Sequence, residues 1–335
     1  MSIQETNLKA IADAIRAKLG TTDTIQASQF AAKIAAISTG VAKPSWVQST
    51  LPSNGIWKGT CYGAGKFVAI LRNSSIAAYS TDGINWTQTT LPSYDNWYCL
   101  CYGAGKFVAV SPGSSKAAYS TDGINWTQTT MPGSRDWSSV CYGGGKFVAI
   151  CADSMLPAYS TDGITWTSAR MPVSAKWNSI CYGAGKFVAI DTNYNETTIA
   201  AYSTDGINWT QTTLPINSSW KRVCYGAGKF VAITRTSYAA YSTDGINWTQ
   251  TTFPRGSDGS SCSNVLFYGN GKFIAAQEYD NPAVCSTDGI NWTQTTLPTN
   301  GYNNAAYGDG KFVMISSATT DCLAICLKDS FDEWA

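Results

Sequence analysis

The chain has 335 residues and a formal net charge of +1, with 13% charged and 44% hydrophobic residues and no histidine. Typical soluble domains carry about 25% charged residues, so we expect a nearly neutral surface without the basic excess of nucleic-acid-binding proteins. No segment approaches the roughly 20 apolar residues of a membrane span. The missing histidine excludes Ser–His–Asp and Cys–His catalysis and histidine-ligated zinc, and we expect no cofactor and no metal.

Residues 1–38 predict two short helices, the first ending at Gly20 and the second capped by Ser28. Apolar side chains recur at helical spacing in both: Leu8, Ile11, Ile15 and Leu19, then Phe30, Ile34 and Ile37. Two short helices bury too little surface to be stable alone, so we expect this segment to attach to a partner or to sister chains. Residues 39–45 are typical of a linker.

From residue 46 onward, two phrases recur about every 40 residues. Gly-Lys-Phe occurs seven times, beginning at Gly65, Gly105, Gly145, Gly185, Gly228, Gly271 and Gly310. Ser-Thr-Asp-Gly-Ile followed by Asn or Thr and then Trp occurs six times. Each repeat holds four short segments rich in β-branched and aromatic residues, separated by turn residues, and shows no helical periodicity. Residues 46–335 therefore predict an all-β fold, a seven-bladed β-propeller of four-stranded blades behind a small helical segment.

The two ends of the repeated region complement each other. Residues 46–52 match only the fourth strand of a repeat, Trp86 to Pro92, and the last copy ends at Ala335 without that strand. We therefore expect residues 46–52 to complete the seventh blade and leave no open sheet edge.

Eleven cysteines are present, and five occupy the same place in the repeat, directly before Tyr-Gly. We expect equivalent positions in successive blades to lie too far apart to pair. The cysteines are then buried free thiols, which fits synthesis in a reducing compartment.

The Ser-Thr-Asp-Gly phrase predicts a tight turn between the third and fourth strands. Asp82 can accept backbone hydrogen bonds, Gly83 can adopt positive φ, and Trp86 can pack between blades. The residues given this structural role are Asp82, Trp86, Asp122, Trp126, Asp162, Trp166, Asp205, Trp209, Asp244, Trp248, Asp288 and Trp292. The phrase resembles the Asp-box of sialidase-like propellers, one residue shorter, and in that family the box is a structural hairpin far from the active site.

The copies of the repeat differ most in the segments after the second and fourth strands. In an antiparallel blade these two segments emerge on the same face. The Gly-Ala-Gly and Thr-Asp-Gly turns, which emerge on the other face, scarcely change. Relaxed constraint on long loops is one explanation, and polar recognition with aromatic anchors is the other. The predicted ligand-binding residues are Arg72, Asn73, Tyr94, Asp95, Arg135, Asp136, Tyr194, Asn195, Glu196, Arg235, Glu278, Tyr279, Asp280 and Tyr302.

The N-terminal segment, including Ile11-Ala12-Asp13-Ala14-Ile15-Arg16 and Phe30-Ala31-Ala32-Lys33-Ile34, resembles the helical leader of tail-associated proteins from phages and prophages of Gram-positive gut bacteria. The resemblance implies a virion tail or tail-fibre protein, made in the cytoplasm of the host bacterium. Residues 1–38 would dock to tail or baseplate proteins or form a homo-oligomer, and the propeller would bind host cell-surface polysaccharide, with neither nucleic acid nor membrane as a partner.

Two other functions stay open. A sialidase-like glycosidase is one, because six arginines, Glu196 and Glu278 are expected near the variable face, although only one of the arginines, Arg222, lies on a first strand facing the channel. The six arginines are Arg72, Arg135, Arg170, Arg222, Arg235 and Arg255. Glycoside hydrolysis needs two carboxylates at a fixed separation, and the arginines lie in loops of different type. We therefore expect no enzyme. A structural virion component or protein-binding scaffold is the other alternative.

Overall fold

The computed structural model describes residues 12–16, 45–193, 197–254, 265–276, 282–297, 301–316 and 323–328. The chain divides into two compact units, Met1–Ser45 and Trp46–Ala335. In the first unit, residues 12–16 form a helical turn with Ala12 and Ile15 buried, inside the first predicted helix. The rest of the predicted helical segment and residues 39–44 of the predicted linker lie outside the described residues. None of the helical structure described is long and apolar enough to cross a membrane.

The second unit consists of seven four-stranded antiparallel sheets within the described ranges. The first three are β2 (Trp57–Gly63), β3 (Lys66–Leu71), β4 (Ser74–Ser80), β5 (Thr87–Asp95); β6 (Cys99–Gly103), β7 (Lys106–Val110), β8 (Ser114–Ser120), β9 (Thr127–Arg135); and β10 (Trp137–Gly143), β11 (Lys146–Cys151), β12 (Ala158–Ser160), β13 (Thr167–Ser168).

The next three are β14 (Trp177–Gly183), β15 (Lys186–Asp191), β16 (Thr197–Ser203), β17 (Thr210–Ser218); β18 (Trp220–Gly226), β19 (Lys229–Thr234), β20 (Tyr238–Ser242), β21 (Thr249–Thr252); and β22 (Val265–Gly269), β23 (Lys272–Ala276), β24 (Pro282–Ser286), β25 (Thr293–Thr296). The last sheet holds β26 (Tyr302–Gly308), β27 (Lys311–Ser316), β28 (Leu323–Lys328) and β1 (Ser45–Thr50).

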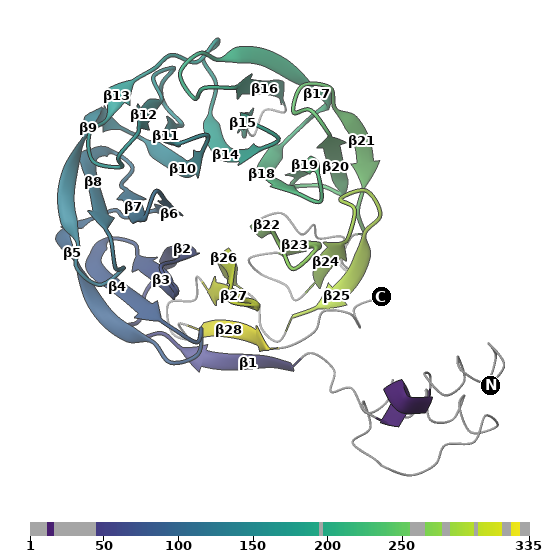
Figure 1. The fold of residues 1–335 in the computed structure, drawn as a ribbon. Coiled ribbons are helices and arrows are strands. Elements are labelled where there is room, and N and C mark those ends of the chain that lie inside the picture. The colour runs from purple at the N-terminus through teal and green to yellow at the C-terminus, as the bar shows by residue number, and fades with distance from the viewer. Residues whose placement is uncertain are drawn as a thin grey trace. The chain divides into compact units, whose positions relative to one another are not determined.

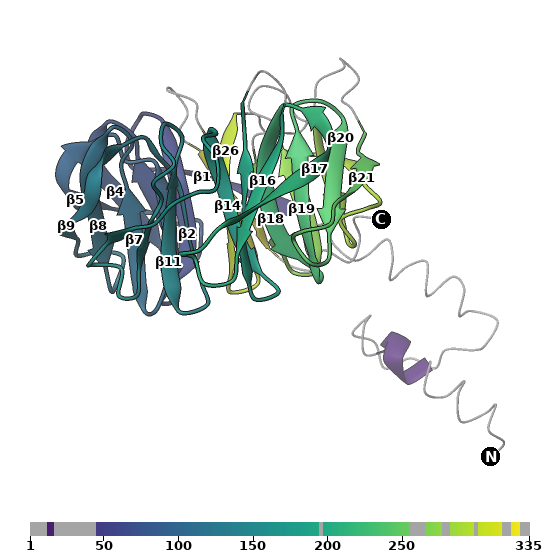
Figure 2. The ribbon, with the colours of Figure 1, turned by 90° about the horizontal axis from the view of Figure 1, so that it is seen from above.

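The sheets stand around a common central axis as the blades of a propeller (Figure 1). The first strand of each blade, such as β2 or β14, lies nearest the centre, and the fourth strand lies at the circumference. Seen edge-on, the strands run across the thickness of the ring (Figure 2). The predicted seven-bladed, four-stranded architecture is confirmed.

The strand at the start of the repeated region closes the ring. The last sheet has the order β1-β28-β27-β26, so β1 supplies its outermost strand, as expected from residues 46–52. Thr89 Oγ1 of β5 donates to the Ile124 carbonyl of the next blade at 2.6 Å, and Ser49 of β1 makes the corresponding bond to the Ile84 carbonyl of the first blade. The seventh blade therefore meets the first through the same contact that joins its neighbours.

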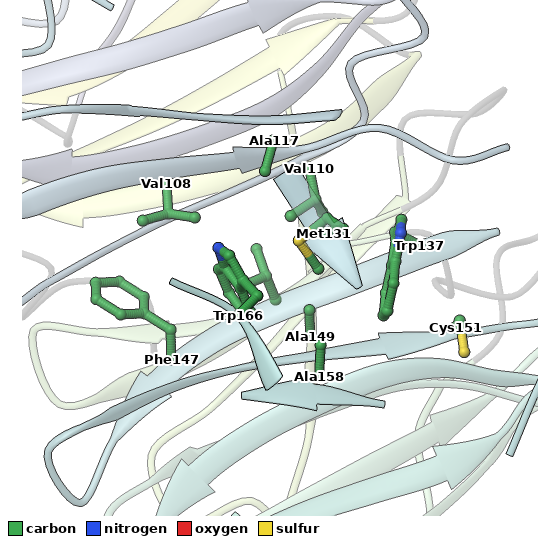
Figure 3. Close-up of a cluster of buried hydrophobic side chains, with 11 residues drawn as sticks. Val108, Val110, Ala117, Met131, Trp137, Phe147, Ala149, Cys151, Ala158 and Trp166 are labelled. Atoms are coloured by element: carbon green, nitrogen blue, oxygen red, sulfur yellow. The ribbon is translucent and has the colours of Figure 1, made fainter. Parts of the chain in front are cut away.

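The hydrophobic core lies between blades. Phe147, Val148, Ala149 and Ile150 on β11 are all 0% exposed, because both faces of the second strand are covered by neighbouring blades. Figure 3 shows one such interface, where Trp137 and other side chains of the third blade meet Val108 and Val110 of the second. Continuous burial explains why this strand is an unbroken apolar run rather than an alternating one.

The Ser-Thr-Asp-Gly turns hold themselves together through their own side chains. Asp82 Oδ1 accepts hydrogen bonds from the Ile84 and Asn85 N–H groups, both at 2.8 Å, and Ser80 Oγ accepts from the Gly83 N–H at 2.8 Å. Although burial acts in the other direction, these bonds hold the pKa of Asp82 well below its usual range.

The glycine of the turn is required for two reasons, as Gly123 in the second blade shows. Its φ is +74°, and an added Cβ would lie 2.7 Å from Val68 Cγ2 of the preceding blade. Trp126, which ends the same turn, packs on the interface between these two blades, with its ring centroid 6.4 Å from that of Phe107. Turn and interface are therefore specified by the same short phrase.

Candidate ligand-binding face and central cavity

The connections after the second and fourth strands meet on one face, which we call the variable-loop face. Arg72 Nε, in the β3–β4 turn, donates to Asn96 Oδ1 in the β5–β6 connection at 2.9 Å. In the second blade the Gly113 N–H of the corresponding turn donates to the Arg135 carbonyl at 2.8 Å. The β2–β3 and β4–β5 turns lie at the other ends of these antiparallel strands, on what we call the constant face.

Several predicted ligand-binding residues are exposed on the variable-loop face. Tyr94 is 69% exposed, and Asn73, Asp136 and Arg235 are also exposed. Nearby Tyr238, which the sequence reasoning did not select, is 38% exposed. This face therefore offers aromatic and polar side chains to solvent, the combination that suits hydroxyl-rich or peptide ligands.

Two other predicted residues on this face make contacts within the protein. The Asp95 carboxylate accepts hydrogen bonds from Ser111 Oγ at 2.6 Å and Ser114 Oγ at 3.1 Å and pairs with Lys116 Nζ at 3.2 Å. Despite partial burial, these bonds lower the pKa of Asp95. The guanidinium of Arg135 lies 5.8 Å from the ring centroid of Trp137. Asp95 and Arg135 therefore order the loops beside the exposed residues.

The structure corrects one sequence-based placement. Tyr302 is 1% exposed and packs among Val265, Leu297 and Met314, because it takes the place that Trp57 has in the first blade. It belongs to the core and offers nothing to a ligand. Arg170 forms a β-bridge with Asn208 of the next blade, and the N–H groups of its neighbours Ala169 and Met171 donate to carbonyls of the β11–β12 connection. Tyr194, Asn195, Glu196, Arg255, Glu278, Tyr279 and Asp280 lie outside the described residues.

A cavity of about 200 Å³ occupies the central channel and is lined by the first strands of all seven blades, or residues next to them. Its lining comes from the first positions of these strands, next to the connections of the variable-loop face. The polar members include Lys58, Tyr98, Ser138, Asn178, Arg222, Asn303 and Asn304. Sequence reasoning found only Arg222 here. The signal it missed is the pair of positions directly after the repeated Trp, which differ from blade to blade, whereas the Cys-Tyr-Gly at the other end of the strand recurs in five blades.

Contacts across the join between the seventh, first and second blades order this lining. Lys58 Nζ donates to Asn303 Oδ1 at 2.9 Å and lies 5.6 Å from the ring centroid of Tyr98. Asn303 is 7% exposed, and its Nδ2 donates to the Trp57 carbonyl at 3.2 Å. Asn178, in the fourth blade, donates from Nδ2 to Thr192 Oγ1 at 2.7 Å. Residues far apart in the sequence thus hold one polar surface in place.

The charged side chains that line the cavity are cationic. The described lining residues include two cations, Lys58 and Arg222, and no carboxylate. Burial raises the pKa of the Cys99 thiol to about 12, while Arg222 and Lys58 both act to lower it. Burial also raises the pKa of Tyr98, again against the field of Arg222. The charges of Lys58, on the first blade, and Arg222, on the fifth, therefore both act on Cys99 of the second blade.

The cysteines deeper in the channel are unpaired within the described residues, as expected. Burial raises the pKa of the Cys61 thiol, and Cys101 of the next blade adds to this shift. The pKa of Cys101 is raised by burial and, to a smaller extent, by Cys141 and Cys99. Eight cysteines of the described ranges carry free thiols, and within those ranges no group of ligating side chains could hold a metal ion.

No protein family model and no curated protein matches the sequence. Solved structures do match. A catalytically inactive virginiamycin B lyase from Staphylococcus aureus with quinupristin is 11% identical, with a TM-score of 0.73 over 86% of this chain and 100% of the lyase. The chain is a β-propeller. YCF48 bound to the D1 peptide matches this propeller with a TM-score of 0.67 at 14% identity, covering 87% of this chain and 96% of YCF48.

The WD40 propeller domain of Doa1 is also similar, with a TM-score of 0.61 at 12% identity over 88% of this chain and 100% of that domain. At such identities the likeness shows the fold alone. An antibiotic lyase, a peptide-bound protein and a WD40 domain share this architecture, so function has to be argued from the site.

Proposed function

We propose that this protein is a phage or prophage tail or tail-fibre protein that binds host cell-surface polysaccharide through the variable-loop face. The observation that carries the proposal is the collection of divergent, solvent-exposed polar and aromatic side chains around one end of the channel, while the other end repeats from blade to blade. Aromatic rings and amides suit hydroxyl-rich ligands, and a near-neutral surface suits contact with a cell envelope without nonspecific electrostatic adhesion.

The repeated turns and the N-terminal segment support the same assignment. The turns resemble the Asp-box of sialidase-like propellers, and residues 1–38 resemble the leader of phage tail-associated proteins. In this proposal residues 1–38 attach the propeller to tail or baseplate proteins, or to sister chains, and the protein resides in the virion tail after synthesis in the host cytoplasm. The propeller acts by binding and not by catalysis.

The comparison with the lyase favours binding over lyase chemistry. The similar virginiamycin B lyase is catalytically inactive when one histidine is replaced by alanine. This chain contains no histidine. A reaction that depends on that side chain is therefore not carried over with the fold.

A protein-binding scaffold is the second candidate function. YCF48, whose propeller is similar, is bound to a peptide. An extended peptide would use the same exposed side chains as a polysaccharide, so the test has to separate the two ligands.

Adsorption to host cells tests the proposal. A fluorescent fusion of the full chain should bind host cells, and periodate treatment of the cells, which cleaves sugar diols, should abolish binding, whereas protease treatment should not. Replacing Tyr94 and Tyr238 by alanine should weaken adsorption by more than about tenfold without lowering Tm, because exposed anchors contribute to contact and little to the core.

The matched control replaces Thr81 and Thr121, exposed on the constant face, by alanine and should adsorb normally. Unchanged adsorption of the double tyrosine variant would contradict the assignment of the face. Protease-sensitive, periodate-resistant binding would favour the protein-binding scaffold.

A further inference from the structure

The central cavity has a composition unlike the loops around it. Of its polar side chains, Lys58 and Arg222 are cationic, Asn178, Asn303 and Asn304 are amides, and none of the described lining residues is acidic. Lysine and arginine are donors only, and the other polar side chains of the lining are neutral hydroxyls and amides, so every charged group of the described lining is a hydrogen-bond donor. A neutral sugar ring, which needs donors and acceptors in similar number, matches this lining less well than a group made of acceptors.

The cationic side of the cavity is already ordered. Lys58 is held between Asn303 Oδ1, at 2.9 Å, and the Tyr98 ring, at 5.6 Å. Asn304 Nδ2 donates to the Lys58 carbonyl at 3.1 Å, which fixes the backbone of the same residue. A side chain ordered before binding loses less conformational entropy when a ligand arrives, so this arrangement favours affinity.

The size of the cavity limits the ligand group. A single water needs roughly 10–15 Å³ of such space, and the cavity provides about 200 Å³. It therefore admits a group of several non-hydrogen atoms, such as a carboxylate or phosphate with part of the sugar that carries it. Inside a channel walled by protein, charge-assisted hydrogen bonds to such an oxyanion are stronger than on an open surface.

We propose that the central cavity binds an oxyanion group, carboxylate or phosphate, carried by a sugar unit of the polysaccharide, with Lys58 and Arg222 as its cationic contacts. The proposal rests on the proposed function and deepens it, since it names the chemical class of the unit that enters the channel. The variable loops then contact the neutral remainder of the polymer, and the cavity selects acidic polymers over neutral ones.

Calorimetric titration of the full chain with D-glucuronate, with inorganic phosphate and with neutral D-glucose tests the proposal. We expect one of the two anions to bind with one-to-one stoichiometry, more tightly than glucose and more weakly as salt is added. Tighter glucuronate identifies a carboxylate as the group, and tighter phosphate identifies a phosphate ester. Binding of neither anion, or equal binding of glucose, would overturn the proposal.

Charge-removing variants locate the anion. Arg222→Gln and Lys58→Gln should each weaken binding of the preferred anion by more than about tenfold, which is about 1.4 kcal/mol. Lys176→Gln is the matched control, because Lys176 is an exposed cation in the connection before β14, was not among the predicted ligand-binding residues and does not line the cavity. Equal losses in all three variants, or no loss in the two cavity variants, would place the anion elsewhere and overturn the proposal. The two cavity variants lie in different blades, so one remains informative if the other does not fold.

Adsorption to host cells separates this proposal from the proposed function. Wild-type protein that binds an anion through Arg222 and Lys58 but does not adsorb to host polysaccharide supports the cavity and contradicts the proposed function. Adsorption that is unchanged in both cavity variants supports the proposed function and overturns the assignment of the acidic unit to the cavity.

Discussion

The constant face and the variable-loop face are built on the same strands but are stabilised differently. In the constant-face turns each polar side chain bonds within its own turn, as the carboxylate of Asp82 does with the N–H groups of Ile84 and Asn85. On the variable-loop face each blade uses a different contact, such as Arg72 to Asn96 in one and Asp95 to Ser111 in the next. Loops held by interchangeable contacts tolerate substitution, whereas turns whose side chains complete their own backbone hydrogen bonding do not.

The two ends of the channel show the same contrast. At the constant end, every first strand finishes in a glycine that lies flat on the tyrosine of the next blade. These pairs run around the whole ring: Gly63–Tyr102, Gly103–Tyr142, Gly143–Tyr182, Gly183–Tyr225, Gly226–Tyr268, Gly269–Tyr307 and Gly308–Tyr62. At the other end the corresponding strand positions carry Lys58, Tyr98, Ser138 and Asn178. Glycine–tyrosine packing between blades constrains the residues at the constant end of the channel, whereas the residues at the other end differ from blade to blade.

The largest expected effect comes from opening the ring. Deleting residues 1–52 removes β1, its bond from Ser49 to the first blade, and Leu51, which is 2% exposed. We expect loss of cooperative unfolding or aggregation, because the last sheet then presents an unpaired edge. Deleting residues 1–44 leaves β1 in place and should preserve the thermal transition of the propeller. Equal Tm values for the two truncations would contradict closure by β1.

A smaller effect should separate the crowded glycines of the constant end from the open ones. In Gly103→Ala the new Cβ would lie 2.0 Å from Tyr142 Cγ. Overpacking of this kind costs about 1–3 kcal/mol and displaces one blade from the next. The control, Gly105→Ala, has φ +73° and nothing within 4 Å of the added Cβ, so only backbone strain is introduced. Urea unfolding that ranks Gly105→Ala as the more damaging change would contradict the role of the tyrosine–glycine ring.

Most of the acid sensitivity of the protein should come from the constant face, where the pKa of each of the six turn aspartates is lowered, whereas on the variable-loop face Asp95 adds a single such group. Despite partial burial, hydrogen bonds within the turn lower the pKa of Asp288 from 3.8 to about 2, and those of its counterparts are lowered too. A carboxylate with a lowered folded-state pKa stabilises the native state at higher pH, and this contribution is lost as the pH falls from about 4 toward 2. Tm should therefore drop over that interval.

Replacing one of these aspartates tests the origin of the effect. Asp82→Ala should cost on the order of 1 kcal/mol at neutral pH, because the Ile84 and Asn85 N–H groups lose a charged acceptor, and should make the acid dependence less steep. An acid profile identical to that of the wild-type protein would show that other carboxylates determine it.

The smallest effect belongs to the variable-loop face. Partial burial and the neighbouring Asp153 carboxylate raise the pKa of Asp136. Its charged form is therefore disfavoured in the folded state, opposite in sign to Asp82. Asp136→Asn should leave stability at neutral pH within about 0.5 kcal/mol or raise it slightly. A loss as large as that of Asp82→Ala would remove the distinction between the two faces.

The sequence alone determined the blades, their number, the turns and the strand that closes the ring. These features depend on short-range chemistry: Asp82 bonds two and three residues away, Gly83 takes a φ of +77°, and the repeat length matches one four-stranded unit. Such contacts are encoded within a few residues, and the internal repetition makes them visible in many copies.

Only the tertiary structure decided what the channel contains. Lys58 and Asn303 are 245 positions apart and become partners because the ring closes. The ring likewise lets the charge of Arg222, on the fifth blade, act on Cys99 of the second. The sequence analysis placed Tyr302 among the ligand-binding residues because a tyrosine stands here where the first blade has Trp57. The structure buries Tyr302 as it buries Trp57. Distances across a ring depend on the number of blades and on how they pack, and no local pattern of residues encodes them.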